Sequence, residues 1–238
     1  MFKKNILISG GSSGLGFEIV KYFSKLHNIY VFSRKKRTLN SNINFFSVDL
    51  SDEHSSLNAF EVLKKKISKI DLIVCCAGNS KGINKNNILN KKNLISFFNS
   101  NLFTFTNLIN SYLKVFKKKK TNIIVISSIA SKKIIDAPIG YSLAKNNLDF
   151  IVRILAKKFA SNKIKFNIIS PGNILIKNNN WFKKFKKNSK YVKNYIKNNV
   201  PLNSFVQPKE IINIIRLLSD ETQNITGGDF VVDGGQTL

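Results

Sequence analysis

The chain is poor in cysteine and histidine. Its two cysteines, Cys75 and Cys76, are neighbours, and its two histidines are separated from them and from each other in the sequence. A bridge between adjacent cysteines is strained and closes almost no loop, so a disulfide framework is excluded. Adjacent thiols and remote histidines also lack the spacing of metal ligands, so we expect no metal site.

Acidic residues are scarce as well. Thirteen Asp and Glu face 39 Lys and Arg, which gives a net charge of +26. Such an excess of positive charge can bind nucleic acid, an anionic membrane or an acidic partner, or it can reflect a composition rich in lysine throughout. No helix-turn-helix, zinc or aromatic RNA-reading motif is present, so we expect no nucleic-acid binding. An acidic partner and a merely lysine-rich composition both remain open.

Long hydrophobic runs are also missing. No apolar stretch approaches the length that spans a membrane, and the apolar run near the N-terminus is too short for a signal peptide. We therefore expect a cytoplasmic protein without a membrane partner. With 238 residues, 43% of them hydrophobic, the chain can form one α/β domain over residues 1–238.

Short apolar runs alternate with segments of helical length. Most runs lack a polar alternation, which is typical of strands covered on both faces. The pattern predicts a Rossmann-like, doubly wound α/β fold, with a mostly parallel seven-stranded sheet and helices on both faces. The predicted strands are 5–9, 29–33, 43–48, 71–76, 122–127, 165–170 and 229–233, and the predicted helices are 14–27, 53–69, 88–116, 140–161 and 208–219.

A glycine-rich turn, "ISGGSSGLG" (8–16), connects the first predicted strand to the first helix. Gly10, Gly14 and Gly16 allow a tight turn and a close approach of the backbone to a pyrophosphate. The following helix N-terminus offers free N–H groups and a partial positive charge. Ser12 and Ser13 can add hydroxyl hydrogen bonds. The turn therefore predicts a dinucleotide site.

The end of the second strand bears on the choice of cofactor. An acid at this position binds the ribose 2′-hydroxyl of NAD, but the sequence reads "VFSRKKR" and offers only cations. The guanidinium of Arg34 suits a 2′-phosphate, so NADP(H) is preferred and NAD(H) is possible. Asp49, followed by Leu50 after the third strand, is placed to accept a hydrogen bond from the adenine amino group.

A tyrosine and a lysine lie four residues apart in "YSLAK" (141–145), so a helix places them on one face. A nearby ammonium favours the phenolate. We therefore expect Lys145 to lower the pKa of Tyr141 towards neutrality, where a general acid is most effective.

Taken in order, these motifs resemble the short-chain dehydrogenase/reductase family over essentially the whole chain. The glycine-rich turn, Ala77 and Gly78 after the fourth strand, a helical asparagine in "NSNLF", a serine thirteen residues before Tyr141, and Pro171 with Gly172 match its motifs. The resemblance implies the catalytic residues Asn101, Ser128, Tyr141 and Lys145, with Asn99 as a competitor for Asn101. It implies cofactor contacts from Gly10, Ser12, Ser13, Gly14, Leu15, Gly16, Arg34, Asp49, Leu50, Ala77, Gly78, Tyr141, Lys145, Pro171, Gly172 and Ile174.

The chain departs from the family's pattern in three places. Ser9 replaces a threonine and keeps its hydroxyl. Cys75 and Cys76 replace two asparagines, the first of which ties neighbouring strands together in the family. Ile176 replaces a threonine that binds the nicotinamide amide, and we expect backbone groups near Ile174 to take over this contact.

The resemblance also implies a mechanism. Tyr141 protonates a carbonyl oxygen that Ser128 holds and stabilises. Lys145 binds the nicotinamide ribose, and Asn101 holds a water that resupplies the proton.

The substrate is less defined. The insert 176–202 carries aromatic residues at roughly helical spacing among lysines. It is either a helical flap with a solvated basic face or a substrate lid that receives an acidic carrier or a phosphate. Two enzyme functions remain open: a 3-oxoacyl-[acyl-carrier-protein] reductase, which would work with an acidic acyl carrier protein, and an enzyme acting on a sugar or other small polar alcohol. A non-catalytic nucleotide- or nucleic-acid-binding protein is a remote alternative, because the intact set of Ser128, Tyr141 and Lys145 argues against it. The resemblance further implies a homotetramer or homodimer.

Overall fold

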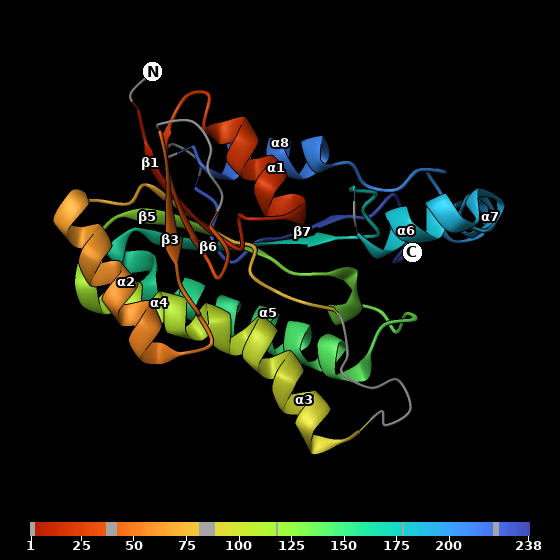
Figure 1. Ribbon diagram of the computed structural model, residues 1–238, viewed down its shortest axis with the longest axis horizontal. Helices are drawn as coiled ribbons and strands as arrows, with labels where there is room; N and C mark the ends of the chain where they lie inside the picture. Colours follow the sequence, from red (N-terminus) through yellow and green to blue (C-terminus); the bar gives the residue numbers. More distant parts are fainter. Residues whose placement is uncertain (1–2, 37–41, 81–88, 118, 178, 221–223) are drawn as a thin grey trace.

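The computed structural model describes residues 3–36, 42–80, 89–117, 119–177, 179–220 and 224–238. One sheet runs through the molecule in the order β3-β2-β1-β4-β5-β6-β7, and every strand pairing is parallel (Figure 1). The prediction of a Rossmann-like, doubly wound fold is confirmed. The strands are β1 (Asn5–Ser9), β2 (Asn28–Ser33), β3 (Ile43–Ser47), β4 (Leu72–Cys75), β5 (Thr121–Ile126), β6 (Ile164–Pro171) and β7 (Asp229–Val232).

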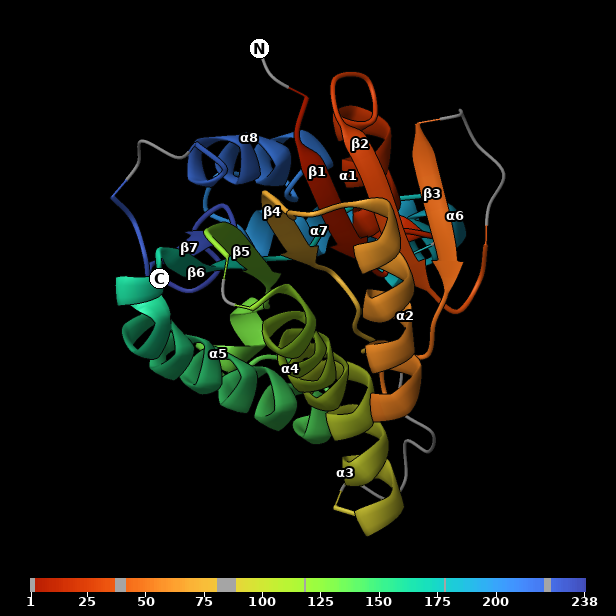
Figure 2. The same ribbon diagram turned by 90° about the vertical axis from the view of Figure 1, so that its left-hand side faces the viewer.

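Helices cover both faces of the sheet (Figure 2). On one face lie α1 (Gly14–Phe23) and α8 (Pro208–Leu218), and on the other lie α2 (Glu53–Lys66), α4 (Thr104–Phe116) and α5 (Ile139–Phe159). Because side chains alternate along a strand, the strands β1 to β6 each contribute to two separate apolar cores. Ile8 of β1 belongs to the α1–α8 side, and Leu7 belongs to the α2–α4–α5 side.

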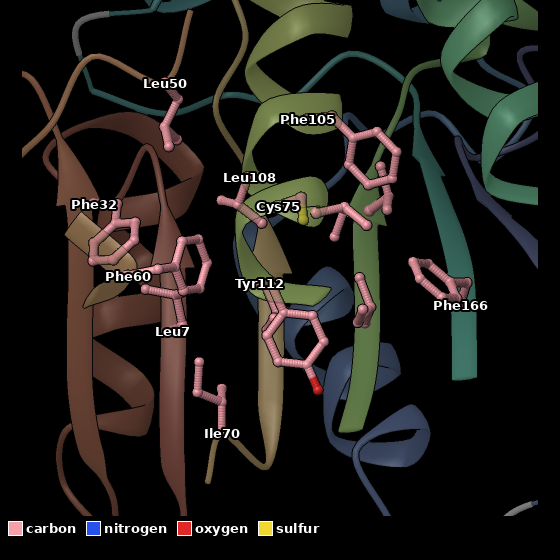
Figure 3. Packing of buried hydrophobic residues seen from close by; sticks show 14 of the residues in the cluster. Leu7, Phe32, Leu50, Phe60, Ile70, Cys75, Phe105, Leu108, Tyr112 and Phe166 are labelled. Carbon is pink, nitrogen blue, oxygen red and sulfur yellow. The ribbon is translucent and has the colours of Figure 1, made fainter. Parts of the chain in front are cut away.

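The larger core lies beneath α2 and α4 and is rich in aromatic rings (Figure 3). Phe60 contacts Phe32 with ring centroids 5.1 Å apart and Phe116 at 6.2 Å. Tyr112 is fully buried in the same cluster, and its hydroxyl donates to the Lys119 carbonyl at 2.7 Å. Each such ring contributes about 1.5–3 kcal/mol through burial alone, so this core supports the strands that present the site.

The order of the strands reverses between β1 and β4. From β1 the sheet continues to β2 and β3 on one side, and from β4 it continues to β5, β6 and β7 on the other. In an open α/β sheet this position leaves a crevice at the carboxyl ends of the strands, where ligands bind. Gly10 follows β1 there, and Cys76 follows β4.

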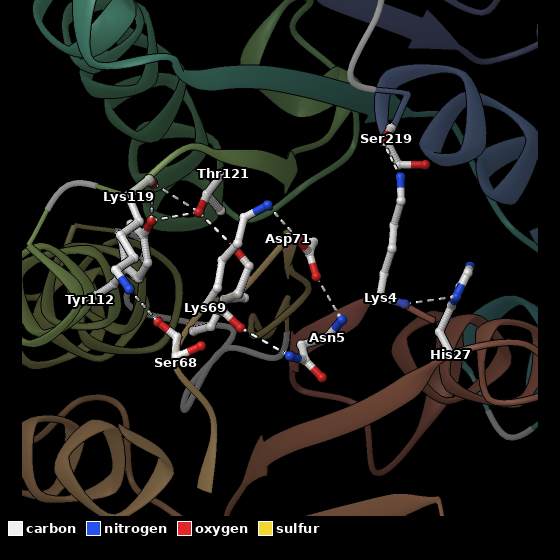
Figure 4. A network of polar contacts seen from close by, with 11 residues as sticks. Lys4, Asn5, His27, Ser68, Lys69, Asp71, Tyr112, Lys119, Thr121 and Ser219 are labelled. Carbon is white, nitrogen blue, oxygen red and sulfur yellow. Dashed lines mark hydrogen bonds and ion pairs between the residues drawn. The ribbon is translucent and has the colours of Figure 1, made fainter. Parts of the chain in front are cut away.

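The opposite, amino end of the sheet is held by polar contacts (Figure 4). The Asn5 amide donates to Asp71 at 2.9 Å, and the Lys4 ammonium donates to the Ser219 carbonyl at 2.9 Å. The Thr121 hydroxyl donates to the Ile70 carbonyl at 2.7 Å. These contacts join the beginnings of strands and helix ends, far from the crevice, and their role is structural.

The predicted regular helix over 88–116 is wrong in detail. Its first residue lies outside the described residues, as does the rest of 81–88. Beyond it the chain forms α3 (Lys91–Phe98), a π-helix η1 (Asn99–Phe103) and then α4. The wider turn of a π-helix changes which side chains face the sheet, and such turns occur frequently at functional sites.

The insert 176–202 folds into α6 (Asn180–Lys187) and α7 (Ser189–Asn199), which extend beyond the sheet on the right of Figure 1. Asn179 and Asn188 cap these helices by accepting from Phe182 and Tyr191 amides. The aromatic side forms a third apolar cluster, in which Trp181 contacts Phe205 at 4.8 Å between centroids. Tyr191, another aromatic residue of the insert, lies outside this cluster and is 49% exposed. Residue 178 lies outside the described residues.

No helix within these described ranges is long and apolar enough to cross a membrane.

Candidate active site

The glycine-rich turn packs too tightly for side chains. Gly10 has φ of +71°, and a Cβ there would lie 2.8 Å from the Ala77 backbone nitrogen. A Cβ on Gly16 would lie 2.5 Å from the Gly10 carbonyl oxygen. Gly14 has φ of +55° but faces open space, with no atom within 4 Å of its would-be Cβ. Two glycines therefore close the turn, and the third leaves room beside it.

The N-terminus of α1 is open to an anion. Ser13 precedes the helix in an extended conformation and makes no side-chain capping hydrogen bond, and the first turn has no acidic residue. Ser13 and Gly14 are exposed, Ser12 and Leu15 are half-buried, and Gly16 is buried. Uncapped amides with a positive helix end are the groups that bind a phosphate. This donor set fits the pyrophosphate of a dinucleotide.

The ends of β2 and β3 bring a cation and an anion near each other. Hydrogen bonds from the Ser51 amide and hydroxyl, at 3.0 and 2.7 Å, lower the pKa of Asp49, and the charge of Arg34 lowers it further. Arg34 is exposed, whereas Leu50 is buried. In the described part of this stretch, an exposed guanidinium therefore lies near an ionised carboxylate. Arg37 of the same cluster lies outside the described residues.

The loop after β4 is tied to β1 by a serine. The Ala77 amide donates to the Ser9 hydroxyl at 3.3 Å, so the hydroxyl kept at this position has a structural partner. Cys75 packs within the larger core, and the β1–β4 register continues to the pair Ser9 and Cys75. Burial raises the pKa of both thiols, that of Cys76 to about 12. Both cysteines are therefore neutral packing residues.

Gly78 lies next to two other expected site residues, Asn101 and Lys145. A Cβ on Gly78 would lie 2.8 Å from Oδ1 of Asn101 and 3.5 Å from Nζ of Lys145. Lys145 is buried, and its ammonium donates to the Ile126 carbonyl at 2.9 Å. The same Nζ lies 5.9 Å from the centroid of the Tyr141 ring. Helix α5, the π-helix and the ends of β4 and β5 thus converge on one point.

Tyr141 forms a side-chain hydrogen bond with Ser128, which lies just after β5. The neighbouring Ser127 is buried, and its hydroxyl has no hydrogen-bond partner among the described residues. Ser128 is half-buried, and its hydroxyl also accepts from the Ala130 amide at 3.2 Å. The serine that reaches the tyrosine is therefore Ser128.

The expected lowering of the tyrosine pKa is wrong. Burial raises the pKa of Tyr141, the hydrogen bond from Ser128 opposes this, and the charge of Asp149 adds to it. Burial also lowers the pKa of Lys145 to about 8, with Asp149 opposing. Desolvation penalises the charged form of either group, so the tyrosine keeps its proton while the lysine is close to losing one.

Asn101 is held rigidly by the π-helix. Its amide nitrogen donates to the carbonyls of Asn79 and Phe97 at 2.9 and 3.0 Å, and its Oδ1 accepts from the Asn79 amide at 3.1 Å. It is 1% exposed. Asn99, the competing candidate, is exposed on the outside of the same helix. The structure brings Asn101, and not Asn99, into the site.

The end of β6 contributes a second close approach. A Cβ on Gly172, after Pro171, would lie 2.5 Å from Oε1 of Gln236, which also accepts from the Asn173 amide at 2.9 Å. The Ile174 carbonyl accepts a hydrogen bond from the Asn179 side chain. The expected contact of backbone groups near Ile174 with a nicotinamide amide stays a prediction, since a carbonyl oxygen can accept a second hydrogen bond.

Comparison with known proteins agrees with this arrangement. A short-chain dehydrogenase family model, described as enoyl-(acyl carrier protein) reductase, matches residues 13–237. The chain belongs to the short-chain dehydrogenase/reductase family. As a member of it, the chain is an NAD(P)-dependent oxidoreductase, as its motifs predict.

One curated relative in this family is the 3-oxoacyl-[acyl-carrier-protein] reductase FabG of Buchnera aphidicola. It is 30% identical over 250 residues, which cover 99% of this chain and 98% of the relative.

Solved structures of short-chain dehydrogenases superimpose closely. "ElxO with NADP Bound" has a TM-score of 0.89 at 24% identity, with 99% of both chains covered, and shows the fold. A 4-hydroxyisoleucine dehydrogenase complexed with NADH has a TM-score of 0.83 at 27% identity, again with 99% of both chains covered.

Sequence reasoning about the short-chain dehydrogenase motifs missed three residues near this site. Asn179 and Gln236 act through their amides on the loop after β6, and Asp149 acts through its charge on α5. The spacing of Asp149, four residues after Lys145, was a signal available in the sequence. The two amides had no such signal in a chain rich in asparagine.

Proposed function

We propose that the chain reduces a 3-oxoacyl thioester to the 3-hydroxyacyl thioester with NADPH. The observation that carries the proposal is the hydrogen bond between Ser128 and Tyr141 beside the buried Lys145. Ketone reduction requires a proton donor at the carbonyl oxygen, and these three side chains provide one.

Tyr141 acts as the general acid. Because burial raises its pKa, the phenol carries its proton at neutral pH and can donate it to a developing alkoxide. Ser128 holds the carbonyl oxygen and stabilises the charge that develops on it. The nicotinamide, when bound, supplies the hydride to carbon.

Lys145 and Asn101 support the proton donor. With a pKa of about 8, Lys145 is mainly an ammonium at neutral pH and favours negative charge on the neighbouring tyrosine oxygen. Lys145 binds the nicotinamide ribose in the proposed complex. Asn101, fixed by its bonds to Asn79 and Phe97, holds the water that returns a proton to the tyrosine.

The proposed cofactor is NADP(H), with NAD(H) as the alternative. The exposed guanidinium of Arg34 suits a 2′-phosphate, and no acidic side chain follows β2 before residue 36. The uncapped N-terminus of α1 receives the pyrophosphate, and Asp49 accepts from the adenine amino group.

An acidic acyl carrier protein is the proposed partner. The insert 176–202 contains eight lysines and no acidic residue. A shallow hollow of about 520 Å³ is lined by Phe182, Phe185, Lys186 and Lys187, among others. A basic surface with apolar side chains complements an acidic carrier. The Buchnera relative, which bears the name of a 3-oxoacyl-[acyl-carrier-protein] reductase, supports the same substrate.

A second candidate is the oxidation or reduction of a small polar alcohol such as a sugar. The likeness to a 4-hydroxyisoleucine dehydrogenase at 27% identity supports it. The catalytic side chains would act in the same way, and the insert would close over the smaller substrate.

Cofactor consumption distinguishes the two candidates. Acetoacetyl thioesters on acyl carrier protein and on coenzyme A are compared with keto-sugars and amino-acid ketones, each with NADPH and with NADH. We expect NADPH oxidation with the thioesters, fastest on the carrier protein. Turnover of only the small polar ketones would replace the first candidate by the second.

A further inference from the structure

Helix α5 carries three polar side chains at intervals of four residues. Tyr141 and Lys145 belong to the proposed active site, and Asp149 follows one turn later on the same face. The Asp149 side chain is 2% exposed. A carboxylate so deeply buried requires a partner or a function.

One oxygen of this carboxylate has a partner. Oδ2 of Asp149 forms an ion pair with Lys132, whose ammonium also contacts Oδ2 of Asp229 on β7. Arg153 lies 3.2 Å from the same oxygen of Asp229, and the Ser170 hydroxyl donates to its Oδ1 at 2.8 Å. Asp229 is thus satisfied by several groups, whereas Asp149 relies on Lys132.

The ion pair with Lys132 reaches the catalytic serine. Lys132 ends the short turn that begins at Ser128, where the Ser131 amide and hydroxyl donate to the Ser128 carbonyl at 3.1 and 2.7 Å. Asn146 of α5 also donates to the Ser131 carbonyl at 3.2 Å. Asp149 therefore connects the turn of Ser128 to the helix of Tyr141.

The other oxygen of Asp149 is exceptional. Oδ1 is buried and has no hydrogen-bond partner among the described residues. Buried polar atoms are nearly always paired, so an unpaired carboxylate oxygen inside the protein calls for an explanation. Its negative charge acts on both neighbours that precede it on the helix, Lys145 and Tyr141.

We propose that Asp149 is a positioning residue of the active site: its carboxylate is the counter-charge that keeps Lys145 an ammonium, and through Lys132 it fixes the turn that carries Ser128. This inference rests on the proposed ketone reduction, which requires a protonated Tyr141 and a charged Lys145.

The electrostatic surroundings support this role. Burial lowers the pKa of Lys145 to about 8, and Asp149 is the largest opposing influence, ahead of Cys76 and Cys75 on the β4 side. Several charged and titratable groups surround Asp149 and Lys145: Tyr141 and Arg153 on α5, Lys132 after the Ser128 turn, Asp229 on β7, and Cys75 and Cys76. Removing the carboxylate lowers the pKa of Lys145 further.

The variant Asp149→Asn keeps the shape of the side chain and removes its charge. We expect the alkaline limb of kcat/KM for ketone reduction to move to lower pH by about one unit, the size of an opposite charge at close range. Asp229→Asn is the matched control, because it removes the other carboxylate on Lys132. Its alkaline limb stays in place, even if its Tm falls.

Lys132→Gln gives a shift of opposite sign. Without the neutralising ammonium, the charge of Asp149 acts more strongly on Lys145, and the alkaline limb moves to higher pH. If Asp149→Asn does not fold, the shift in Lys132→Gln still tests the coupling of Asp149 to Lys145. If the alkaline limb is unchanged in Asp149→Asn and Lys132→Gln, or shifts as much as it does in Asp229→Asn, the ion pair between Asp149 and Lys132 is only structural.

A readout without turnover separates this inference from the proposed function. The ¹³Cε resonance of Lys145, assigned with Lys145→Arg, is titrated in the cofactor-free protein. We expect a midpoint near pH 8 and a lower midpoint in Asp149→Asn. If wild-type protein reduces no ketone but the midpoint of Lys145 is still lower in Asp149→Asn, the proposed function is refuted and the coupling of Asp149 to Lys145 is kept. If wild-type protein is active but Asp149→Asn leaves the midpoint unchanged, the coupling is refuted.

Discussion

Burial acts in opposite directions on the two residues at the centre of the site. It raises the pKa of Tyr141 and lowers that of Lys145, because the low-dielectric surroundings disfavour the phenolate and the ammonium alike. A ketone reductase uses the tyrosine as a proton donor, so a protonated phenol is the appropriate ground state. The lysine favours the phenolate as it forms, when the proton leaves.

Arg34 offers a residue-scale test of the cofactor. We expect Arg34→Ala to weaken NADPH binding by about ten- to a hundredfold, the range of a charge-assisted hydrogen bond of about 1.5–3 kcal/mol. NADH binding stays nearly unchanged, because NADH has no 2′-phosphate. Lys35→Ala is the control, because Lys35 is also an exposed cation, one residue later. Fluorescence titration gives the Kd values, and equal losses for both cofactors would contradict the Arg34 assignment.

The identities of the site residues could be read from the sequence, but their electrostatic state could not. Spacing of four on a helix places Tyr141 and Lys145 together, and the structure does so. The sign of the tyrosine shift depends on burial, to which Phe97 of α3 contributes with ring centroids 6.5 Å apart, and no local pattern specifies this contact. The occupied carbonyl of Ile174 likewise depends on Asn179, a contact across a loop.

At the scale of elements, the π-helix η1 determines which asparagine enters the site. An uninterrupted α-helix over 99–103 would have been expected from the sequence, and its periodicity does not favour Asn101 over Asn99. The extra residue per turn directs Asn101 inward, where its amide bonds the Asn79 and Phe97 carbonyls. The tertiary contact with Asn79 offsets the local cost of the wider turn.

Asn101→Ala tests this element. It leaves the Asn79 amide and carbonyl without their side-chain partner, so we expect a loss of about 1–3 kcal/mol in the free energy of unfolding and a marked fall in kcat. Asn99→Ala, two residues away and exposed, changes both quantities little. Urea unfolding and steady-state kinetics measure them. Equal effects of the two substitutions would show that the π-helix does not select Asn101.

The strands and most helices could be predicted from the sequence with small errors at their ends. For β1 the predicted range 5–9 is the observed one, because its apolar run is bounded by a polar residue and a glycine. The π-helix could not be predicted, since helical periodicity continues across it. The exposure of Tyr191 depends on how α6 and α7 pack against Phe205.

At the scale of the whole molecule, the buried thiols make stability depend on alkaline pH. The folded-state pKa values of Cys75 and Cys76 lie above their ordinary value of 9.0, so the unfolded chain loses these protons first. Their stabilising contribution is present below pH 9 and falls by about 1.4 kcal/mol per thiol for each pH unit above it. Lys145, whose pKa is lowered, acts with the opposite sign between about pH 8 and 10.5.

The thiol contribution is isolated by comparing wild type with Cys75→Ala/Cys76→Ala. From pH 8 to pH 10, we expect the free energy of unfolding of wild type to fall by about 3 kcal/mol relative to that of the double variant. Urea unfolding at the two pH values measures the difference. Parallel pH dependences would show that the thiols titrate normally in the folded protein.

The expected homotetramer or homodimer also belongs to this scale. Leu143, Phe150 and Ile154 are 43%, 61% and 49% exposed along α5, at spacings that keep them near one face. We expect a second copy to cover them, so Phe150→Glu should reduce the sedimentation mass towards one chain. Leu26→Glu, on an exposed apolar residue after α1, is the control and should leave the mass unchanged.

The role of Tyr141 as proton donor is tested by the rate of NADPH oxidation with acetoacetyl thioester, measured for wild type, Tyr141→Phe and Tyr191→Phe. Both substitutions remove one hydroxyl, but only Tyr141 hydrogen-bonds Ser128. We expect a loss of kcat of at least about 10²–10⁴-fold for Tyr141→Phe, with Tyr191→Phe close to wild type. Undiminished turnover in Tyr141→Phe would contradict it.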